Sequence, residues 1–144
     1  MRLFRPIPMP PNRQVGALCW RYDEKQRIEI LTITTRRSRR WSIPKGGQIE
    51  GLSEQESASQ EAWEEAGVRG QASVMPVGEY QLIQGASRSA LGKTTVTVYS
   101  LHVTTEETNF PEFGQRKIAW RKPEKAAAKV REPDLARLIR DFVN

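Results

Sequence analysis

The stretch between Ser53 and Gly67 constrains the fold of this chain more than any other feature. Ser53 is followed three residues later by Glu56, which is the pattern of a capping box at a helix start. Gly67 supplies a helix stop, because glycine tolerates the left-handed conformation just past a helix end. The residues between them are rich in Ala and Glu and contain neither Pro nor Gly. The sequence therefore predicts a helix from about Glu54 to Ala66.

This predicted helix has a small apolar stripe and an acidic face. At about 100° per residue the stripe consists of Ala58, Ala62 and Ala66, with Trp63 at its edge. Small residues there allow the helix to lie close to a sheet. Glu61 and Glu65 lie one turn apart on a different face, Glu64 flanks them, and Glu54 lies two turns earlier on the same side.

Carboxylates gathered in this way repel one another, and those in the last turn also face the negative end of the helix dipole. No Lys or Arg within the helix offsets this charge. A divalent cation would do so, and Mg²⁺ is usually held by one or two carboxylates together with substrate phosphates. The acidic face therefore predicts a site for Mg²⁺, with Mn²⁺ as an alternative. The competing interpretation is a solvated acidic surface.

Basic residues and glycines precede the helix. Lys45, Gly46 and Gly47 follow Pro44 and combine a cation with a backbone that a ligand can approach closely. Before them lies an arginine cluster, which consists of Arg36, Arg37, Arg39 and Arg40. Arginine suits bidentate contacts to phosphate. We therefore expect the arginine cluster, Lys45 and Gly47 to bind a phosphorylated substrate; the alternative for the cluster is a solvated loop.

The segment from Gly46 to Val68 resembles the signature of the Nudix hydrolase family. That signature reads Gly, five residues, Glu, seven residues, Arg-Glu, an aliphatic residue, any residue, Glu-Glu, any residue, Gly and an aliphatic residue. The matching positions are Glu61, Ala62, Glu64, Glu65, Gly67 and Val68. Two positions depart from it: Leu52 stands where the first Glu is expected, and Gln60 stands where the Arg is expected.

The resemblance implies roles for the carboxylates. Glu61, Glu64 and Glu65 are then the catalytic residues and, with Gly46, the metal-site residues. In the family the signature arginine helps to orient these carboxylates, so its replacement by Gln60 is expected to affect the rate more than the fold. Glu50 and Glu54 bracket Leu52, and the helix geometry favours Glu54 as the compensating carboxylate.

The resemblance extends over most of residues 15–142. The positions that carry it, besides the arginine cluster, are Trp41, the Pro44–Gly46 loop, Tyr99, Phe110-Pro111-Glu112, Arg116, Trp120 and Glu132-Pro133-Asp134-Leu135. In this respect the chain is most similar to the diphosphoinositol polyphosphate phosphohydrolase branch and its bacterial relatives, although Phe110 replaces a Trp that is associated with the bacterial motif.

The rest of the chain predicts a mixed sheet between helices. Strands are expected at 15–20, 27–34, 41–43, 74–77, 80–83, 93–104 and 115–120, the first two as a hairpin. Further helices are expected at 123–128 and 134–142. The long strand at 93–104 carries apolar residues on both parities, which is typical of a central strand. Strands and helices do not alternate regularly, so the pattern predicts an α/β Nudix-type α/β/α sandwich rather than a doubly wound fold. Residues 1–12 are expected to form an extended arm and residues 13–144 a single domain.

Composition limits the remaining possibilities. No apolar run approaches the roughly 20 residues of a membrane span, and no signal-peptide pattern is present. Cys19 is the single cysteine and is expected in the core, while the single histidine, His102, receives no role. We therefore expect a cytoplasmic protein. The net charge of +6 favours a polyanionic partner and does not fix the fold.

Two functions follow as hypotheses. The first is a Mg²⁺-dependent pyrophosphohydrolase that cleaves a phosphoanhydride bond in a highly phosphorylated small molecule, such as a diphosphoinositol polyphosphate or a dinucleoside polyphosphate. RNA with a phosphorylated 5′ end is the alternative substrate. The second hypothesis is a catalytically weak scaffold that binds phosphorylated ligands or RNA, motivated by Leu52 and Gln60. The aromatic residues are not interleaved with basic ones in an RNA-binding pattern, which makes nucleic acid the less favoured partner. The sequence does not determine the oligomeric state.

Overall fold

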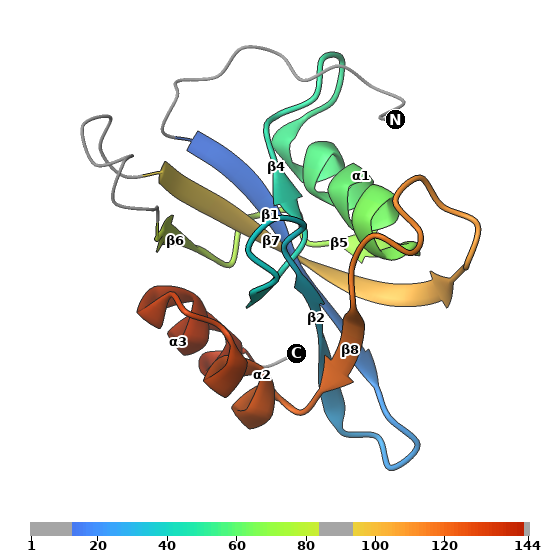
Figure 1. The fold of residues 1–144 in the computed structure, drawn as a ribbon, viewed down its shortest axis with the longest axis vertical. Coiled ribbons are helices and arrows are strands. Elements are labelled where there is room, and N and C mark those ends of the chain that lie inside the picture. Colours follow the sequence, from blue (N-terminus) through green and yellow to red (C-terminus); the bar gives the residue numbers. More distant parts are fainter. Residues whose placement is uncertain (1–12, 84–93, 143–144) are drawn as a thin grey trace.

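The computed structural model describes residues 13–83 and 94–142 and shows a mixed sheet flanked by helices (Figure 1). The strands are β1 (Arg13–Tyr22), β2 (Ile28–Thr34), β3 (Trp41–Ser42), β4 (Lys45–Gly46), β5 (Val68–Ala72), β6 (Gly78–Leu82), β7 (Thr94–Glu106) and β8 (Ile118–Arg121). The helices are α1 (Glu54–Ala66), α2 (Pro123–Lys129) and α3 (Pro133–Asp141). Within these ranges no helix combines the length and the apolar character that a membrane span requires.

Strands β1 and β7 form the centre of the sheet. They run parallel, with Arg13 opposite Thr95 at one end and Trp20 opposite His102 at the other. On one side β2 pairs antiparallel with β1 and in turn pairs with β3 and β8, while β5 and β6 pair antiparallel with β7. Strand β4 pairs with β1, and this pairing fixes Lys45 and Gly46, called the glycine segment below, against the central strand. The predicted hairpin and the predicted central strand are both confirmed.

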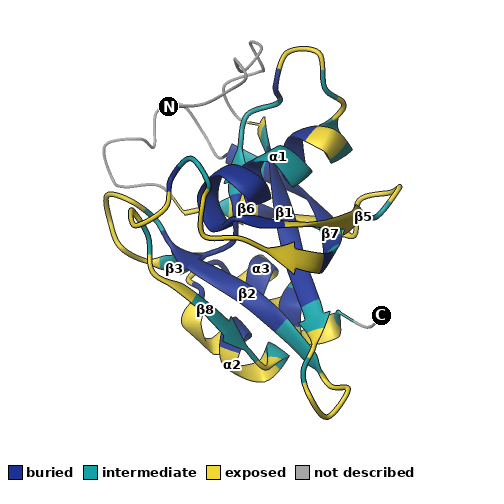
Figure 2. Cartoon of the chain, turned by 90° about the vertical axis from the view of Figure 1, so that its right-hand side faces the viewer, coloured by how far each residue is buried: buried dark blue, intermediate teal, exposed yellow. Residues whose placement is uncertain are grey.

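The sheet carries a hydrophobic core on each face, so the predicted α/β/α sandwich is confirmed. Side chains alternate along β1: Ala17 and Cys19 pack on the α1 side, and Leu18 and Trp20 pack on the side of α2 and α3. Figure 1 shows α1 on one face and the other two helices on the opposite face, and Figure 2 shows the buried residues concentrated between them. Cys19 is a buried core residue, as predicted.

Helix α1 has the bounds that the sequence predicts. The Ser53 hydroxyl accepts a hydrogen bond from the Glu56 backbone at 3.1 Å, and the Glu56 carboxylate accepts one from the Ser53 backbone at 2.9 Å. At the other end Gly67 adopts the left-handed conformation, with φ of 71°. The apolar stripe of the helix is buried against the sheet. Both capping predictions and the predicted packing face are confirmed.

The segment after α1 differs from its prediction. Residues 74–77 do not form a strand, and the chain pairs with β7 earlier, through β5. Val74 and Met75 are largely exposed, and Pro76 has no backbone N–H to donate to a ladder. The register of β5 shifts between Arg69 and Gly70, where a Cβ atom on Gly70 would collide with the His102 carbonyl. The predicted arm at 1–12 and the first residue of the strand predicted at 93–104 lie outside the described residues.

Candidate active site

Glu61 and Glu65 form a buried carboxylate pair under strand β4. Glu61 is fully buried and Glu65 is 5% exposed. The backbone N–H of Lys45 points to Glu65 Oε1 at 3.4 Å. A Cβ atom on Gly46 would lie 2.4 Å from Glu61 Oε2, so only glycine fits there without displacing the carboxylate. The spacing on α1 and the pairing of β4 with β1 together place the glycine segment over the pair.

The two carboxyl groups influence each other strongly. Burial raises the pKa of Glu65 well above its ordinary value, and the hydrogen bond that it shares with Glu61 raises it further. The positive charges of Arg116 and Lys45 act in the opposite direction on this pKa. A divalent cation bound beside Glu65 would favour its charged form.

Glu64 has a different environment from the pair. Its side chain is fully buried, and its Oε2 accepts a hydrogen bond from Gln60 Nε2 at 3.0 Å. Its backbone carbonyl accepts a hydrogen bond from the Glu112 N–H at 3.0 Å, which fixes the loop before β8 to α1. Gln60 therefore contacts one of the signature carboxylates even though it lacks the charge of an arginine.

Arg116 reaches the carboxylate pair from the segment before β8. Its Nη2 lies 3.8 Å from Glu65 Oε1 and 2.9 Å from Glu112 Oε1, while its Nη1 donates to the Thr34 carbonyl at 3.1 Å. Glu112 is itself buried. Arg116 and Glu112 are among the positions that carry the family resemblance, but the sequence predicted no role in the site for either of them.

These residues fit a divalent cation. The fit rests on a buried pair of oxygen ligands and on a glycine whose missing side chain lets the Glu61 carboxylate lie against the backbone. In the part of the chain that the structure describes, no three His, Cys, Asp or Glu side chains are gathered in metal-binding geometry. Glu61 and Glu65 lie against Gly46 and Lys45, and one or two carboxylates are the usual number for Mg²⁺.

A small polar cavity of about 170 Å³ lies beside Lys45, and Glu132 and three apolar residues are part of its wall: Trp41, Leu82 and Ile83. Three basic residues, Arg40, Lys45 and Arg131, line it. The hydroxyl-bearing residues Thr35, Ser38 and Ser42 also line it. Burial lowers the pKa of Lys45, while the carboxylates of Glu65 and Glu132 oppose that shift. Charged donors and hydroxyls around one small cavity suit a phosphate group.

The structure separates the members of the arginine cluster. Arg40 lines the small polar cavity, whereas Arg36 and Arg39 donate to Gln115, at 3.1 Å to its side chain and at 3.0 Å to its backbone carbonyl. Arg37 is exposed. Gly47 follows directly after β4 and is half-buried. Arg40 and Lys45 therefore come together as predicted, and Arg131 joins them from the segment before α3 without a signal in the sequence.

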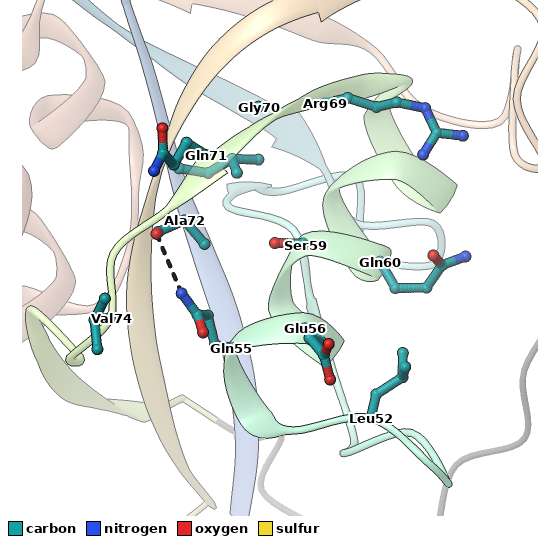
Figure 3. Close-up of a pocket in the computed structure, with 11 residues that line it drawn as sticks. Leu52, Gln55, Glu56, Ser59, Gln60, Arg69, Gly70, Gln71, Ala72 and Val74 are labelled. Carbon is teal, nitrogen blue, oxygen red and sulfur yellow. Dashed lines mark hydrogen bonds between the residues drawn. The ribbon is translucent and has the colours of Figure 1, made fainter.

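Both departures from the signature line one larger cavity. This cavity of about 630 Å³ lies between α1 and β5, and Leu52 and Gln60 are part of its wall (Figure 3). Figure 3 shows the two side chains with Glu56 along one side of the helix. The position that a signature arginine would occupy therefore borders open space rather than packed core.

Glu54 lies two turns before Glu61, at the start of α1. Its Oε1 accepts a hydrogen bond from the Tyr99 hydroxyl at 3.2 Å, which ties the helix to the central strand β7. The structure thus gives this carboxylate a partner in the sheet. Its predicted role as the compensating carboxylate stays a prediction.

The signature carboxylates are less accessible than the sequence suggested. Glu61 and Glu65 lie against the glycine segment and are buried beneath it. They line neither the 170 Å³ cavity nor the 630 Å³ cavity. The neighbouring residue Lys45 connects them to the smaller cavity.

Comparisons with known proteins agree with this fold. Residues 12–142 match the model of the NUDIX domain. The chain is 28% identical over 124 residues to Nudix hydrolase 12, mitochondrial, of Arabidopsis thaliana; the match covers 84% of the chain and 61% of that relative's length.

Solved structures show the same fold at low sequence identity. A NUDIX hydrolase from Nitrosomonas europaea is 20% identical with a TM-score of 0.69, and the match covers 91% of this chain and 87% of that one. The E. coli dihydroneopterin triphosphate pyrophosphohydrolase is 19% identical with a TM-score of 0.66, covering 96% and 98%. A C. elegans Ap4A hydrolase complex is 21% identical with a TM-score of 0.63, covering 90% and 94%.

Proposed function

The chain belongs to the NUDIX domain family, and from this premise we propose that it is a divalent-metal-dependent hydrolase of phosphoanhydride bonds. The observation that carries the proposal is the buried pair of signature residues Glu61 and Glu65, which lies against Gly46. Such a pair is costly to bury unless a cation or a shared proton compensates its charge.

Each residue of the site has a proposed task. Glu61 and Glu65 would hold Mg²⁺ or Mn²⁺, with Gly46 letting the Glu61 carboxylate lie against the backbone. When bound, the metal would neutralise phosphate charge and lower the pKa of a water molecule. Glu64, held by Gln60, is the third proposed catalytic residue.

The small polar cavity supports a highly phosphorylated substrate. Arg40, Lys45 and Arg131 present positive charge to one side of the carboxylate pair, where phosphate groups flanking the cleaved bond would lie. A diphosphoinositol polyphosphate and a dinucleoside polyphosphate both offer several such groups. The chain spans 61% of the length of its plant relative, so the substrate and partners of the whole protein are proposals as well. We likewise propose that residues 13–144 form a single domain and that the protein is cytoplasmic.

A substrate panel tests this proposal. The chain is incubated with Mg²⁺ and, separately, a diphosphoinositol polyphosphate, a dinucleoside polyphosphate, ADP-ribose and 5′-triphosphorylated RNA, and phosphate or nucleotide release is measured. We expect turnover of the first or second compound, and we expect it to stop when EDTA is added. Preferential turnover of the RNA would keep the hydrolase assignment and replace the small-molecule substrate.

A second candidate function rests on Leu52 and Gln60. With two signature positions changed, a catalytically weak scaffold that binds phosphorylated ligands is the alternative. A scaffold would bind members of the panel without releasing product at any Mg²⁺ or Mn²⁺ concentration. Metal titrations that combine ligand binding and product release therefore separate the two functions.

A further inference from the structure

Helix α1 provides no positive charge for its own carboxylates. Its last turn contains no basic residue, and Gln60 stands where the family signature has an arginine. Gln60 donates a neutral hydrogen bond to Glu64 and brings no positive charge to the site. Glu65 is nevertheless 5% exposed, so its negative charge needs a nearby cation to be held in place.

That cation comes from Arg116. Within the described ranges, Arg116 is the residue that forms an ion pair with Glu65, at 3.8 Å from Nη2 to Oε1. Its charge also lowers the Glu65 pKa, against the larger effect of burial. Lys45 reaches the same oxygen through its backbone N–H, so the two groups fix Oε1 from two elements of the chain.

Arg116 is itself held rigidly. Its side chain is 10% exposed, and Glu112 Oε1 accepts from its Nε at 3.1 Å and from its Nη2 at 2.9 Å. The Thr34 carbonyl accepts from Nη1 at 3.1 Å. The Glu112 N–H in turn donates to the Glu64 carbonyl, so the loop that carries this ion pair is fastened to α1 beside the signature carboxylates. A guanidinium with three fixed contacts has little freedom to move.

We propose that Arg116 is a positioning residue for Glu65, which supplies from the segment before β8 the cation that the signature arginine would supply from within α1. This proposal rests on the proposed function, because it assigns Arg116 to the same carboxylate site. Glu112 and Thr34 hold the Arg116 guanidinium, and the guanidinium orients Glu65. Gln60 then has to orient only Glu64, to which it donates a hydrogen bond.

The first test measures Mn²⁺ binding without substrate. Binding is followed by electron paramagnetic resonance for the parent chain, for Arg116→Met and for Arg69→Met as the control. Arg69 also lies near the end of α1, but it stacks over Trp63 and forms its ion pair with Glu107. We expect Arg116→Met to weaken Mn²⁺ binding about tenfold and Arg69→Met to leave it unchanged. If Arg116 affected the site only through its positive charge, Arg116→Met would bind Mn²⁺ more tightly than the parent. Tighter or unchanged Mn²⁺ binding therefore overturns the proposal.

A rescue variant separates positioning from general stability. Gln60→Arg is added to Arg116→Met, since position 60 borders the 630 Å³ cavity and has room for the longer side chain. We expect the double variant to recover most of the Mn²⁺ affinity and of kcat, with KM little changed throughout. Arg116→Lys should recover less, because a single ammonium cannot reproduce the contacts to Glu112, Thr34 and Glu65. A double variant no better than Arg116→Met overturns the proposal.

The same measurements keep the two proposals apart. If the parent binds Mn²⁺ but releases no product from any compound, the hydrolase proposal fails while the binding data still decide the role of Arg116. If the parent hydrolyses its substrate and Arg116→Met does so equally well with equal Mn²⁺ affinity, the positioning role alone fails. A parent chain that binds no Mn²⁺ at all overturns both.

Discussion

Replacement of Gly46 by alanine tests the carboxylate site with the smallest possible change. A Cβ atom at this position would lie 2.4 Å from Glu61 Oε2 and 2.5 Å from its Cδ, whereas ordinary contact begins near 3.4 Å. The backbone of Gly46 is not in the left-handed region, so alanine introduces a collision rather than backbone strain. Because β4 is paired to β1, the carboxylate of Glu61 has to retreat by about 1 Å.

The expected consequence is a large loss of turnover with a moderate loss of stability. A displacement of about 1 Å at a catalytic group lowers the rate roughly a hundredfold. Overpacking of a buried site costs about 1–3 kcal/mol of unfolding free energy. We expect Gly46→Ala to remain folded, to lose about a hundredfold in kcat, and to bind Mn²⁺ more weakly. Product release against Mg²⁺ concentration and urea unfolding measure the two effects.

Gly51→Ala is the matched control. Gly51 has φ of 84°, and a Cβ atom there would meet nothing within 4 Å. Alanine at this position costs about 1–2 kcal/mol of backbone strain without touching Glu61. We expect the control to be destabilised by a similar amount and to keep the parent kcat. If Gly46→Ala retains full turnover, or if both variants lose activity equally, the packing of Gly46 against Glu61 is not what the site depends on.

Three further expectations concern charge. Because the pKa of Glu65 is raised in the folded chain, the metal-free folded chain keeps a proton that the unfolded chain releases above about pH 4.5. The unfolding free energy, measured with urea, should therefore fall as the pH rises above that value, and Mg²⁺ or Glu65→Gln should remove this fall. A flat pH profile in the metal-free parent would refute the expectation. Arg40→Ala should raise KM for highly phosphorylated substrates severalfold more than Arg37→Ala does, because Arg40 lines the small polar cavity and Arg37 does not. Equal KM values for the two variants would count against that cavity as the phosphate site. Glu54→Gln should lower turnover more than Glu56→Gln does. A Glu54→Gln variant with the turnover of the parent would rule out the compensating role of Glu54.

Local signals made much of α1 and its site predictable from the sequence. The capping box, the C-terminal glycine and the alanine stripe are short-range features, and each reports a backbone or packing requirement directly. The same periodicity placed Glu61 and Glu65 on one face, where the structure pairs them. The glycines indicated a backbone that another group can approach closely, and Gly46 does lie against Glu61, but strand β4 itself was not predicted.

Features that depend on distant partners were not predictable. The apolar residues at 74–77 suggested a strand, but the chain leaves α1 at Gly67 already beside β7, where the Gly67 carbonyl accepts from the Glu107 N–H, and β5 forms at once. The sequence likewise could not tell that Arg36 binds Gln115 while Arg40 faces a cavity. Arg116 had no local signal, because its task appears only when the segment before β8 folds over α1.

The most direct test of the carboxylate site is phosphoanhydride hydrolysis against Mg²⁺ concentration for the parent chain and for Glu65→Gln. The substitution keeps the shape of the side chain but removes a charged ligand from the buried pair. Glu61 and Glu65 as the metal-holding pair predict Mg²⁺-dependent turnover in the parent and a loss of at least about a hundredfold in the variant at every Mg²⁺ concentration. A Glu65→Gln variant that hydrolyses the same substrate as fast as the parent, with the same Mg²⁺ dependence, would contradict that assignment.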